Sequence, residues 1–282
     1  MIDAVRRAAR SMRVWAGRDY LKLDRWFLLF AVVPLVSVAL VACGDDDDDD
    51  DGDAEYSLVS DGNLTVCTDS PYPPFEFEEA GEFTGFDMDL LREIAESEGL
   101  ELDVKVVPFD GIWLLPAAGD CDLVGSAMTI TEERSAQALF SDPYFDADQS
   151  LLVRAEDAET FATLEALAGE RIAVQTGTTG EAYAQENTPD GATLVSFDEP
   201  AALFLALESG DVAAILQDLP VNGYRQVQDE SMVVTQTFPT GEQYGFAVAL
   251  DNEALIAAVN ERLEQLRDEG TYDEIYAKWF GE

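Results

Sequence analysis

The chain has 282 residues, of which 58 are Asp or Glu, 16 are Lys or Arg and none is His, so its formal net charge is −42. Such a surface repels DNA and RNA, which excludes a nucleic-acid partner. Without His the chain lacks the commonest metal ligand and the usual general base, so we expect no metal and no cofactor. Catalysis would fall to carboxylates, Lys, Tyr or Cys. Hydrophobic residues make up 47% of the chain, which is typical of a folded protein.

The amino terminus has the pattern of a secretory signal peptide. Residues 1–25 carry a net charge of +4, an uncharged apolar run covers 26–42, and the motif Leu-Val-Ala-Cys ends at Cys43. This motif resembles the lipobox of bacterial lipoproteins, in which the Cys is acylated and becomes the new amino terminus. We therefore predict a signal peptide over 1–43 and a lipid anchor at Cys43 on the extracytoplasmic face of the membrane. An uncleaved anchor helix is the alternative, although the run is at the short limit for a span.

Residues 44–55 are rich in Asp, with seven consecutive aspartates at 45–51. Such a block repels itself, which predicts an extended tether between the membrane and a folded part that starts near residue 56. A calcium-binding strip is the alternative, but it lacks the spaced ligands and the Gly turn of an EF-hand loop.

Strand and helix patterns alternate along the rest of the chain. In chain order, the first half predicts a strand at 64–68, a helix at 85–99, strands at 102–107 and 122–128, and a helix start at Thr131. The second half predicts a strand at 171–176, helices from 181 and over 201–209, strands at 212–216 and 244–250, a helix over 252–267 and a last short helix from 270. This alternation predicts an α/β fold, in which ligands bind at the carboxyl ends of strands.

Three strand ends carry candidate binding residues. In the segment 68–77, three prolines stiffen a loop and fix Tyr72 and Phe75. Rigid aromatics with a carboxylate beside them could sandwich a small polar or cationic ligand, unless the aromatics only pack the loop. Arg134, near a helix start, could hold a carboxylate, unless it is a surface Arg paired with an acid. Asp218 could hold an ammonium group, unless it is a turn residue before Pro220. Together Arg134 and Asp218 would satisfy a zwitterion.

The runs GNLTVCTDSPYPPFEF, GEFTGFDMDL, DLVGSAMTITEER, FSDPYF, RIAVQTGTTGEAY and GTYDEIYAKWF resemble the family 3 solute-binding proteins, in unbroken order over about 60–282. These proteins deliver polar amino acids to ATP-binding-cassette (ABC) importers. The resemblance implies a two-lobed periplasmic-binding-protein-like (type II) α/β fold with two hinge strands and the ligand in the cleft. Lobe 1 would be 56–147 plus 245–282, and lobe 2 would be 148–244.

The resemblance also implies roles for single residues. Arg134 would bind the ligand carboxylate, assisted by Thr129 and by the segment at Ser126 and Ala127, and Asp218 would bind the ammonium group. The remaining predicted ligand contacts are Thr178 and Thr179 as donors, Tyr72 and Phe109 over the ligand side chain, and Asp69 and Gln175 at its distal group. The segment 111–122, with Trp113 and Pro116, departs from the family pattern.

Cys67 and Cys121 would meet an oxidising compartment after export. In the family's sheet order their strands are neighbours, so we predict a disulfide between them. Two buried free thiols are the alternative.

The sequence thus predicts a monomeric, lipid-anchored receptor that hands a free amino acid to an ABC permease and is not an enzyme. Asp69 and Glu76 favour a ligand side chain that donates hydrogen bonds, which indicates a basic amino acid or glutamine. A dehydratase-type enzyme on the same fold and a sensor ectodomain are the alternatives. The enzyme would need a catalytic acid beside Arg134, and the sensor would need a further membrane or signalling segment.

Overall fold

The computed structural model describes residues 56–281. The predicted signal peptide at 1–43, its lipidation residue Cys43 and the acidic tether at 44–55 lie outside the described residues. No helix within the described part combines the length and the apolar character that a membrane crossing needs.

The first of two five-stranded sheets has the strand order β4-β1-β5-β12-β6. Strand β1 pairs in parallel with β4 and β5, whereas β12 pairs antiparallel with β5 and β6. Its strands are β1 (Asn63–Thr68), β4 (Glu101–Val106), β5 (Leu123–Val124), β6 (Leu139–Phe140) and β12 (Ala247–Val248). A small hairpin, β2 (Phe77–Glu79) with β3 (Glu82–Thr84), lies apart from this sheet.

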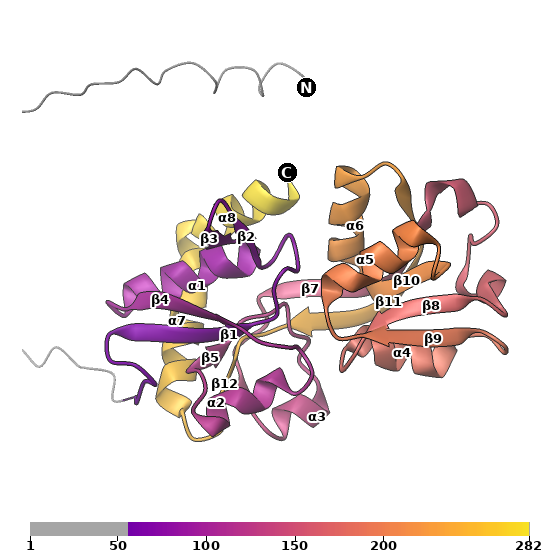
Figure 1. The fold of residues 1–282 in the computed structure, drawn as a ribbon. Helices are drawn as coiled ribbons and strands as arrows, with labels where there is room; N and C mark the ends of the chain where they lie inside the picture. The colour runs from indigo at the N-terminus through magenta and orange to yellow at the C-terminus, as the bar shows by residue number, and fades with distance from the viewer. Residues whose placement is uncertain (1–55, 282) are drawn as a thin grey trace, which may run out of the picture. The chain divides into compact units, whose positions relative to one another are not determined.

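Both faces of the first sheet are covered, because successive strand residues point to opposite sides. Leu64 and Val66 of β1 belong to one apolar cluster, and Cys67 to another. Helices α1 and α8 lie on one side in Figure 1, and α2 and α3 on the other. The helices of this lobe are α1 (Phe86–Ser97), α2 (Leu115–Ala118), α3 (Glu132–Ser135), α7 (Glu253–Glu269) and α8 (Thr271–Phe280), with the 3-10 turn η1 (Ile112–Leu114).

The second sheet has the order β11-β7-β10-β8-β9. Its core residues also alternate, since Leu151 and Val153 of β7 face one cluster and Leu152 faces the other. The strands are β7 (Phe145–Arg154), β8 (Arg171–Gln175), β9 (Thr193–Phe197), β10 (Ala214–Asp218) and β11 (Met232–Tyr244). Its helices are α4 (Thr179–Asn187), α5 (Pro200–Ser209) and α6 (Leu219–Gln228), with the 3-10 turns η2 (Ala155–Asp157) and η3 (Leu164–Leu167).

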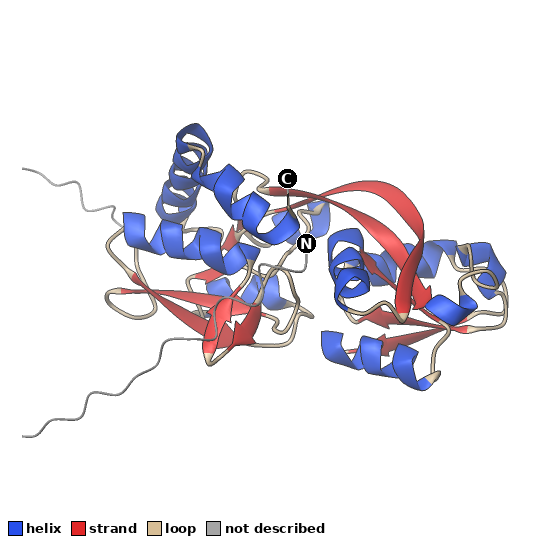
Figure 2. Cartoon of the chain, turned by 90° about the horizontal axis from the view of Figure 1, so that it is seen from above, coloured by secondary structure: helices blue, strands red, loops and turns tan. Residues whose placement is uncertain are grey.

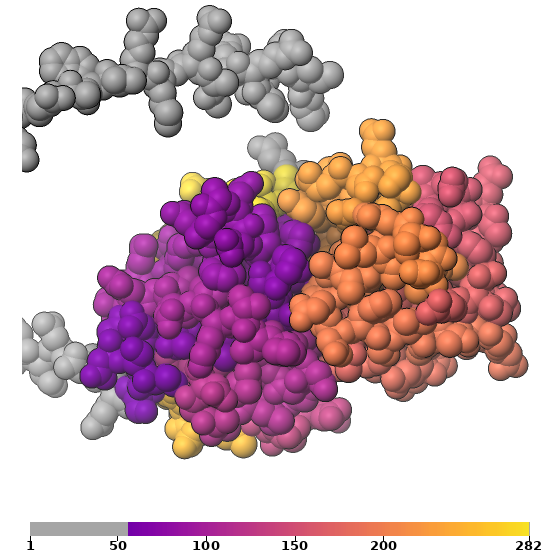
Figure 3. All heavy atoms as spheres, viewed as in Figure 1, coloured from indigo at the N-terminus to yellow at the C-terminus, as the bar shows by residue number. Residues whose placement is uncertain are grey.

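Two long strands connect the sheets. Strands β7 and β11 pair antiparallel from Phe145↔Tyr244 to Arg154↔Met232, and they arch from one lobe to the other in Figure 2. Figure 3, viewed as in Figure 1, shows the two lobes in contact along a narrow line. The predicted α/β fold with two lobes and two hinge strands is confirmed.

Several element boundaries differ from the predictions. The strand expected at 122–128 ends at Val124, because the Ala127 N–H bonds to the Asp87 carboxylate instead of to a neighbouring strand. The strand expected at 212–216 lies two residues later, so that Asp218 is its last residue. The strand expected at 244–250 is divided: Tyr244 ends β11, and only two residues form β12. Helix α4 begins at Thr179 rather than 181, because Thr178 accepts a hydrogen bond from the Glu181 N–H and caps it.

The predicted disulfide is present. Cys67 of β1 and Cys121, which lies just before β5, are bonded with 5.8 Å between their Cα atoms. The bond fastens two paired parallel strands of the first sheet, and it rules out two free thiols at these positions.

Candidate functional site in the interlobe cleft

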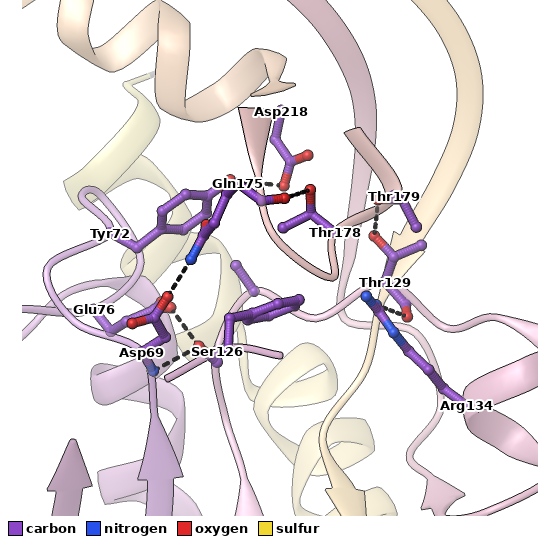
Figure 4. A pocket seen from close by; sticks show the side chains of 12 residues that line it. Asp69, Tyr72, Glu76, Ser126, Thr129, Arg134, Gln175, Thr178, Thr179 and Asp218 are labelled. Atoms are coloured by element: carbon purple, nitrogen blue, oxygen red, sulfur yellow. Dashed lines mark hydrogen bonds between the residues drawn. The ribbon is translucent and has the colours of Figure 1, made fainter. Parts of the chain in front are cut away.

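The structure brings all eleven predicted ligand residues into one pocket, together with Glu76. Lobe 1 and lobe 2 both contribute, and Figure 4 shows how the side chains face one another. The lining residues are Asp69, Tyr72, Glu76, Phe109, Ser126, Ala127, Thr129, Arg134, Gln175, Thr178, Thr179 and Asp218.

The pocket is tight. The centre of a water molecule could occupy only about 20 Å³ of the space inside it. That is room for about one water. A molecule as large as an amino acid therefore needs the walls to move apart.

Arg134 is the positive end of the pocket. Among the described Lys and Arg residues only Arg134 is buried, with 4% of its surface exposed, and no carboxylate lies within ion-pair distance of it. Its guanidinium donates to the backbone carbonyls of Thr129 (2.8 Å) and Gly177 (3.0 Å). Burial lowers the pKa of Arg134 to about 10, and nearby Asp218 and Glu242 oppose that shift. The alternative of a surface Arg paired with an acid is wrong.

Two aromatic rings fix the Arg134 guanidinium in place. Its central carbon lies 5.2 Å from the centre of the Phe109 ring and 5.0 Å from that of Trp113. Trp113 belongs to the segment that departs from the family pattern, here the 3-10 turn η1. Its place beside Arg134 was not predicted from the sequence.

Asp218 is a buried carboxylate with three donors. It accepts hydrogen bonds from the hydroxyls of Tyr72 (3.0 Å) and Tyr244 and from the Gln149 amide (2.6 Å). Burial raises the pKa of Asp218 to about 6, and Glu242 adds to the rise. Because Asp218 is a buried strand residue aimed at the pocket, the alternative of a simple turn residue is wrong.

A second acidic region lies on the side of the pocket away from Arg134 (Figure 4). Asp69 accepts a hydrogen bond from the Gln175 amide, and burial raises its pKa to about 7. Glu76 is fully buried and accepts from the Ser126 hydroxyl at 3.0 Å, while its Oε2 atom has no hydrogen-bond partner. Burial raises the pKa of Glu76 well above its usual range, and Asp87 contributes.

The Ala127 backbone is held in an unusual conformation. Its φ angle is 42°, in the region that non-glycine residues rarely adopt. Asp87 of α1 accepts hydrogen bonds from the Ala127 N–H (2.8 Å) and the Tyr144 hydroxyl (2.7 Å). Asp87 therefore positions the segment that carries Ser126 and Ala127 at the pocket wall.

Thr129 and Thr179 face each other across the lobes. Their hydroxyl oxygens lie 3.4 Å apart, and both donate to the Glu242 carboxylate of β11. Thr178 uses its hydroxyl locally: it donates to the Gln175 carbonyl and caps α4.

Sequence reasoning missed the polar residues that the hinge strands bring to the site. Gln149 lies in β7 and Glu242 in β11, at positions that were not predicted as strand from the residues alone, and Tyr244, expected to begin a strand, ends β11. The alternation of apolar and polar residues at the start of FDADQSLLVR, followed by the apolar run Leu-Leu-Val, could have indicated β7. Glu242 was hard to predict, because its contacts with Thr129 and Thr179 join residues more than 60 positions apart in sequence; only Thr240 is a nearby partner.

A cleft between two α/β lobes, with a cation at one side and carboxylates at the other, defines a receptor that encloses a small polar solute. The model of the bacterial extracellular solute-binding proteins, family 3, matches residues 64–282, and the chain belongs to this family.

Known relatives bind amino acids. A probable histidine-binding protein of Neisseria gonorrhoeae is 30% identical over 267 residues, which cover 92% of this chain and 97% of that protein. The structure of an ancestral arginine-binding protein bound to glutamine is 39% identical, with a TM-score of 0.74, and the match covers 78% of this chain and 99% of that one. An ancestral amino acid-binding protein, a precursor of cyclohexadienyl dehydratase, is 38% identical, with a TM-score of 0.73 over 78% of this chain and 96% of that one.

Proposed function

We propose that this protein captures a basic amino acid or glutamine in its interlobe cleft and delivers it to an ABC importer. Arg134 binds the α-carboxylate, Asp218 binds the α-ammonium group, and the ligand side chain reaches Asp69 and Glu76. Tyr72 and Phe109 cover the ligand, while Gln175, Thr178, Thr179, Thr129, Ser126 and Ala127 complete its surroundings.

The polarity of the pocket carries this proposal. Arg134 is a buried cation with no carboxylate of the described residues in ion-pair contact, and Asp69 and Glu76 lie on the opposite side (Figure 4). The Oε2 atom of Glu76 is a buried polar atom without a partner, and a polar ligand side chain that reached it would satisfy it. A glutamate side chain would meet two further carboxylates there, which disfavours it.

Binding in this proposal works by closing the hinge. Contacts with both lobes stabilise the closed arrangement over the open one, so the ligand shifts the population of an existing motion. Lobe 1 is 56–147 plus 245–282 and lobe 2 is 148–244, which agrees with the crossing of β7 and β11. Acylated Cys43 and the tether at 44–55 keep a monomer at the extracytoplasmic face of the membrane.

A thermal-shift screen of the twenty amino acids, followed by calorimetry, tests the function. We expect arginine, lysine or glutamine to give the largest rise in melting temperature, with a 1:1 stoichiometry. A largest rise with aspartate or glutamate would refute the role of Asp69 and Glu76. No rise with any amino acid would refute the proposed function.

The same purified protein tests the enzymatic alternative. Three pocket carboxyls have raised pKa values: Asp69 and Glu76 lie away from Arg134, and Asp218 is assigned to the ligand ammonium group, which leaves none of the three to act as the proton donor at the proposed substrate carboxylate. We therefore expect no turnover of prephenate-like acids, and release of their dehydrated product would establish an enzyme.

A further inference from the structure

The hinge strand β11 places a carboxylate between the lobes. Glu242 Oε2 accepts hydrogen bonds from the hydroxyl of Thr129 in lobe 1 at 2.8 Å and from that of Thr179 in lobe 2 at 2.6 Å. One carboxylate oxygen of the hinge therefore bridges both walls of the cleft.

In this arrangement Thr129 and Thr179 already use their hydroxyl protons in hydrogen bonds to Glu242. A Thr hydroxyl has one proton to donate. While Thr129 and Thr179 donate theirs to Glu242, neither can donate to the carboxylate of a ligand. The two threonines then contribute to binding indirectly, because their hydrogen bonds to Glu242 hold the two lobes together.

Glu242 also reaches the ammonium side of the pocket. Its Oε1 accepts from the Gln149 amide of β7 at 3.0 Å, and the same amide donates to Asp218 at 2.6 Å. Gln149 is fully buried. The hydrogen-bonded series Asp218, Gln149, Glu242 and the two threonines thus joins both hinge strands to both lobes.

An irregularity in the hinge brings Glu242 to this position. The pairing of β11 with β7 shifts between Phe238, which pairs with Gln149, and Glu242, which pairs with Ala147, so three residues of β11 face Asp148 alone. The Gly241 N–H donates to the Asp148 carboxylate at 3.1 Å and fixes this bulge. Bulges redirect the side chains that follow them.

We propose that Glu242 is a positioning residue for lobe closure: it holds Thr129 and Thr179 together and couples the hinge bulge to the pocket. This inference rests on the proposed function only for its effect on ligand release. Its effect on closure of the lobes needs no ligand.

Hydrogen exchange of the full chain, read by mass spectrometry without amino acid, tests closure. Glu242→Ala should speed exchange in the cleft segments 126–131 and 176–182, which belong to different lobes, while β1 and β10 keep their protection. Glu242→Gln keeps the size and loses the charge, so we expect a smaller change in the same segments. Gln243→Ala is the matched control, because Gln243 is exposed on the same strand and bonds to Asp146 outside the pocket.

Comparing the exchange rates of the Glu242 variants with those of Gln243→Ala decides the proposal. Unchanged exchange in the cleft segments of both Glu242 variants, or equal acceleration in Gln243→Ala, would overturn the proposal. If Glu242→Ala does not fold, the Gln variant decides. If no amino acid binds the wild type, the proposed function fails, but the exchange result still tests Glu242.

Ligand release gives a second readout, with arginine as the probe. The Glu242 variants should release it about tenfold faster with little change in the association rate, because hydrogen bonds to a charged group are lost from the closed state only. Thr179→Val should have a similar effect that does not add to that of Glu242→Ala, since both changes remove the hydrogen bond between Thr179 and Glu242. Additive effects would show that the two residues act separately and would overturn the bridge.

Discussion

Arg134 stands out because of what surrounds it. From residue 56 onward the chain has 46 acidic residues against nine basic ones, yet the one buried guanidinium of the described residues has no carboxylate in ion-pair contact. Leaving a buried cation without a counter-charge costs stability, which the two backbone carbonyls and the rings of Phe109 and Trp113 only partly offset. A ligand carboxylate would recover that cost.

Replacing this cation should remove binding. We expect Arg134→Ala to weaken amino-acid affinity by at least about 30-fold, because a buried charged contact is worth roughly 2–5 kcal/mol and each 1.4 kcal/mol is about tenfold. The fold should persist, since the change breaks no ion pair among residues 56–281. Calorimetry with the amino acid that binds best, alongside the melting temperature, measures both. Arg267→Ala, at an exposed position, is the control, and retained affinity in Arg134→Ala would refute the carboxylate role.

The acids of the pocket should make binding depend on pH. Burial raises the pKa of Asp69 to about 7 and that of Asp218 to about 6. A cation can pair with either group only after its proton leaves, so affinity should rise with pH through these values. For glutamine, which needs only Asp218 in its charged form, the rise should end soon after pH 6. For arginine it should continue to about pH 7.

Titration calorimetry between about pH 5 and pH 8 measures this difference. Asp69→Asn should remove the part of the arginine profile above pH 6 and leave the glutamine profile in place. Parallel profiles for arginine and glutamine in the wild type would argue against contact between Asp69 and a ligand cation.

At the scale of elements, sequence patterns predicted the helices whose apolar residues repeat with the helical period. Helix α1 follows from Leu90, Leu91 and Ile94 on one face, and α7 from Leu255, Val259 and Leu263, and all six side chains are buried. The short β5 and the hinge strands were harder, because long-range contacts define them. Asp87 draws Ala127 out of β5, and β11 depends on pairing with β7 about 90 residues earlier. The site was predicted where residues follow a strand directly, and missed where the hinge supplies them.

Gly85 lies at the start of helix α1, against the loop that carries Tyr72 of the pocket. It precedes α1 with a φ angle of 131°, and a Cβ atom there would lie 2.0 Å from the Phe75 carbonyl oxygen. Gly85→Ala should therefore cost on the order of 3 kcal/mol and displace the loop that carries Tyr72. Gly99→Ala is the matched control: its φ angle is also positive, at 68°, but nothing lies within 4 Å, so about 1 kcal/mol should be lost.

Chemical denaturation and ligand affinity together test this prediction. Gly85→Ala should reduce both the free energy of unfolding and the affinity, whereas Gly99→Ala should reduce only the first, and by less. Equal losses of stability in the two variants would contradict the role assigned to the Phe75 contact.

At the scale of the molecule, charge sets the conditions for stability. The 46 acids and nine bases of residues 56–282 give −37, and mutual repulsion of that size opposes the compact state. Salt shortens the range of the repulsion from about 10 Å at 0.1 M to about 3 Å at 1 M.

The melting temperature should therefore rise by several degrees between about 0.1 M and 1 M KCl. Differential scanning calorimetry of the ligand-free protein measures it. A matched series in sucrose separates screening from a general solute effect, because sucrose carries no charge. A melting temperature that stays constant or falls with salt would contradict the prediction.

The position of β12 in the first sheet has a consequence for the order of assembly. Ala247 and Val248 lie between β5 and β6, so a strand from the end of the chain fills a gap between strands made more than 100 residues earlier. A chain that emerges from its amino terminus can complete the second sheet, whose strands all lie between Phe145 and Tyr244, before the first. Before residues 247 and 248 are added, the first sheet consists of β4, β1 and β5, joined by the Cys67–Cys121 bond. Lobe 1, and with it the binding cleft, is therefore complete only after the segment that contains β12 has emerged.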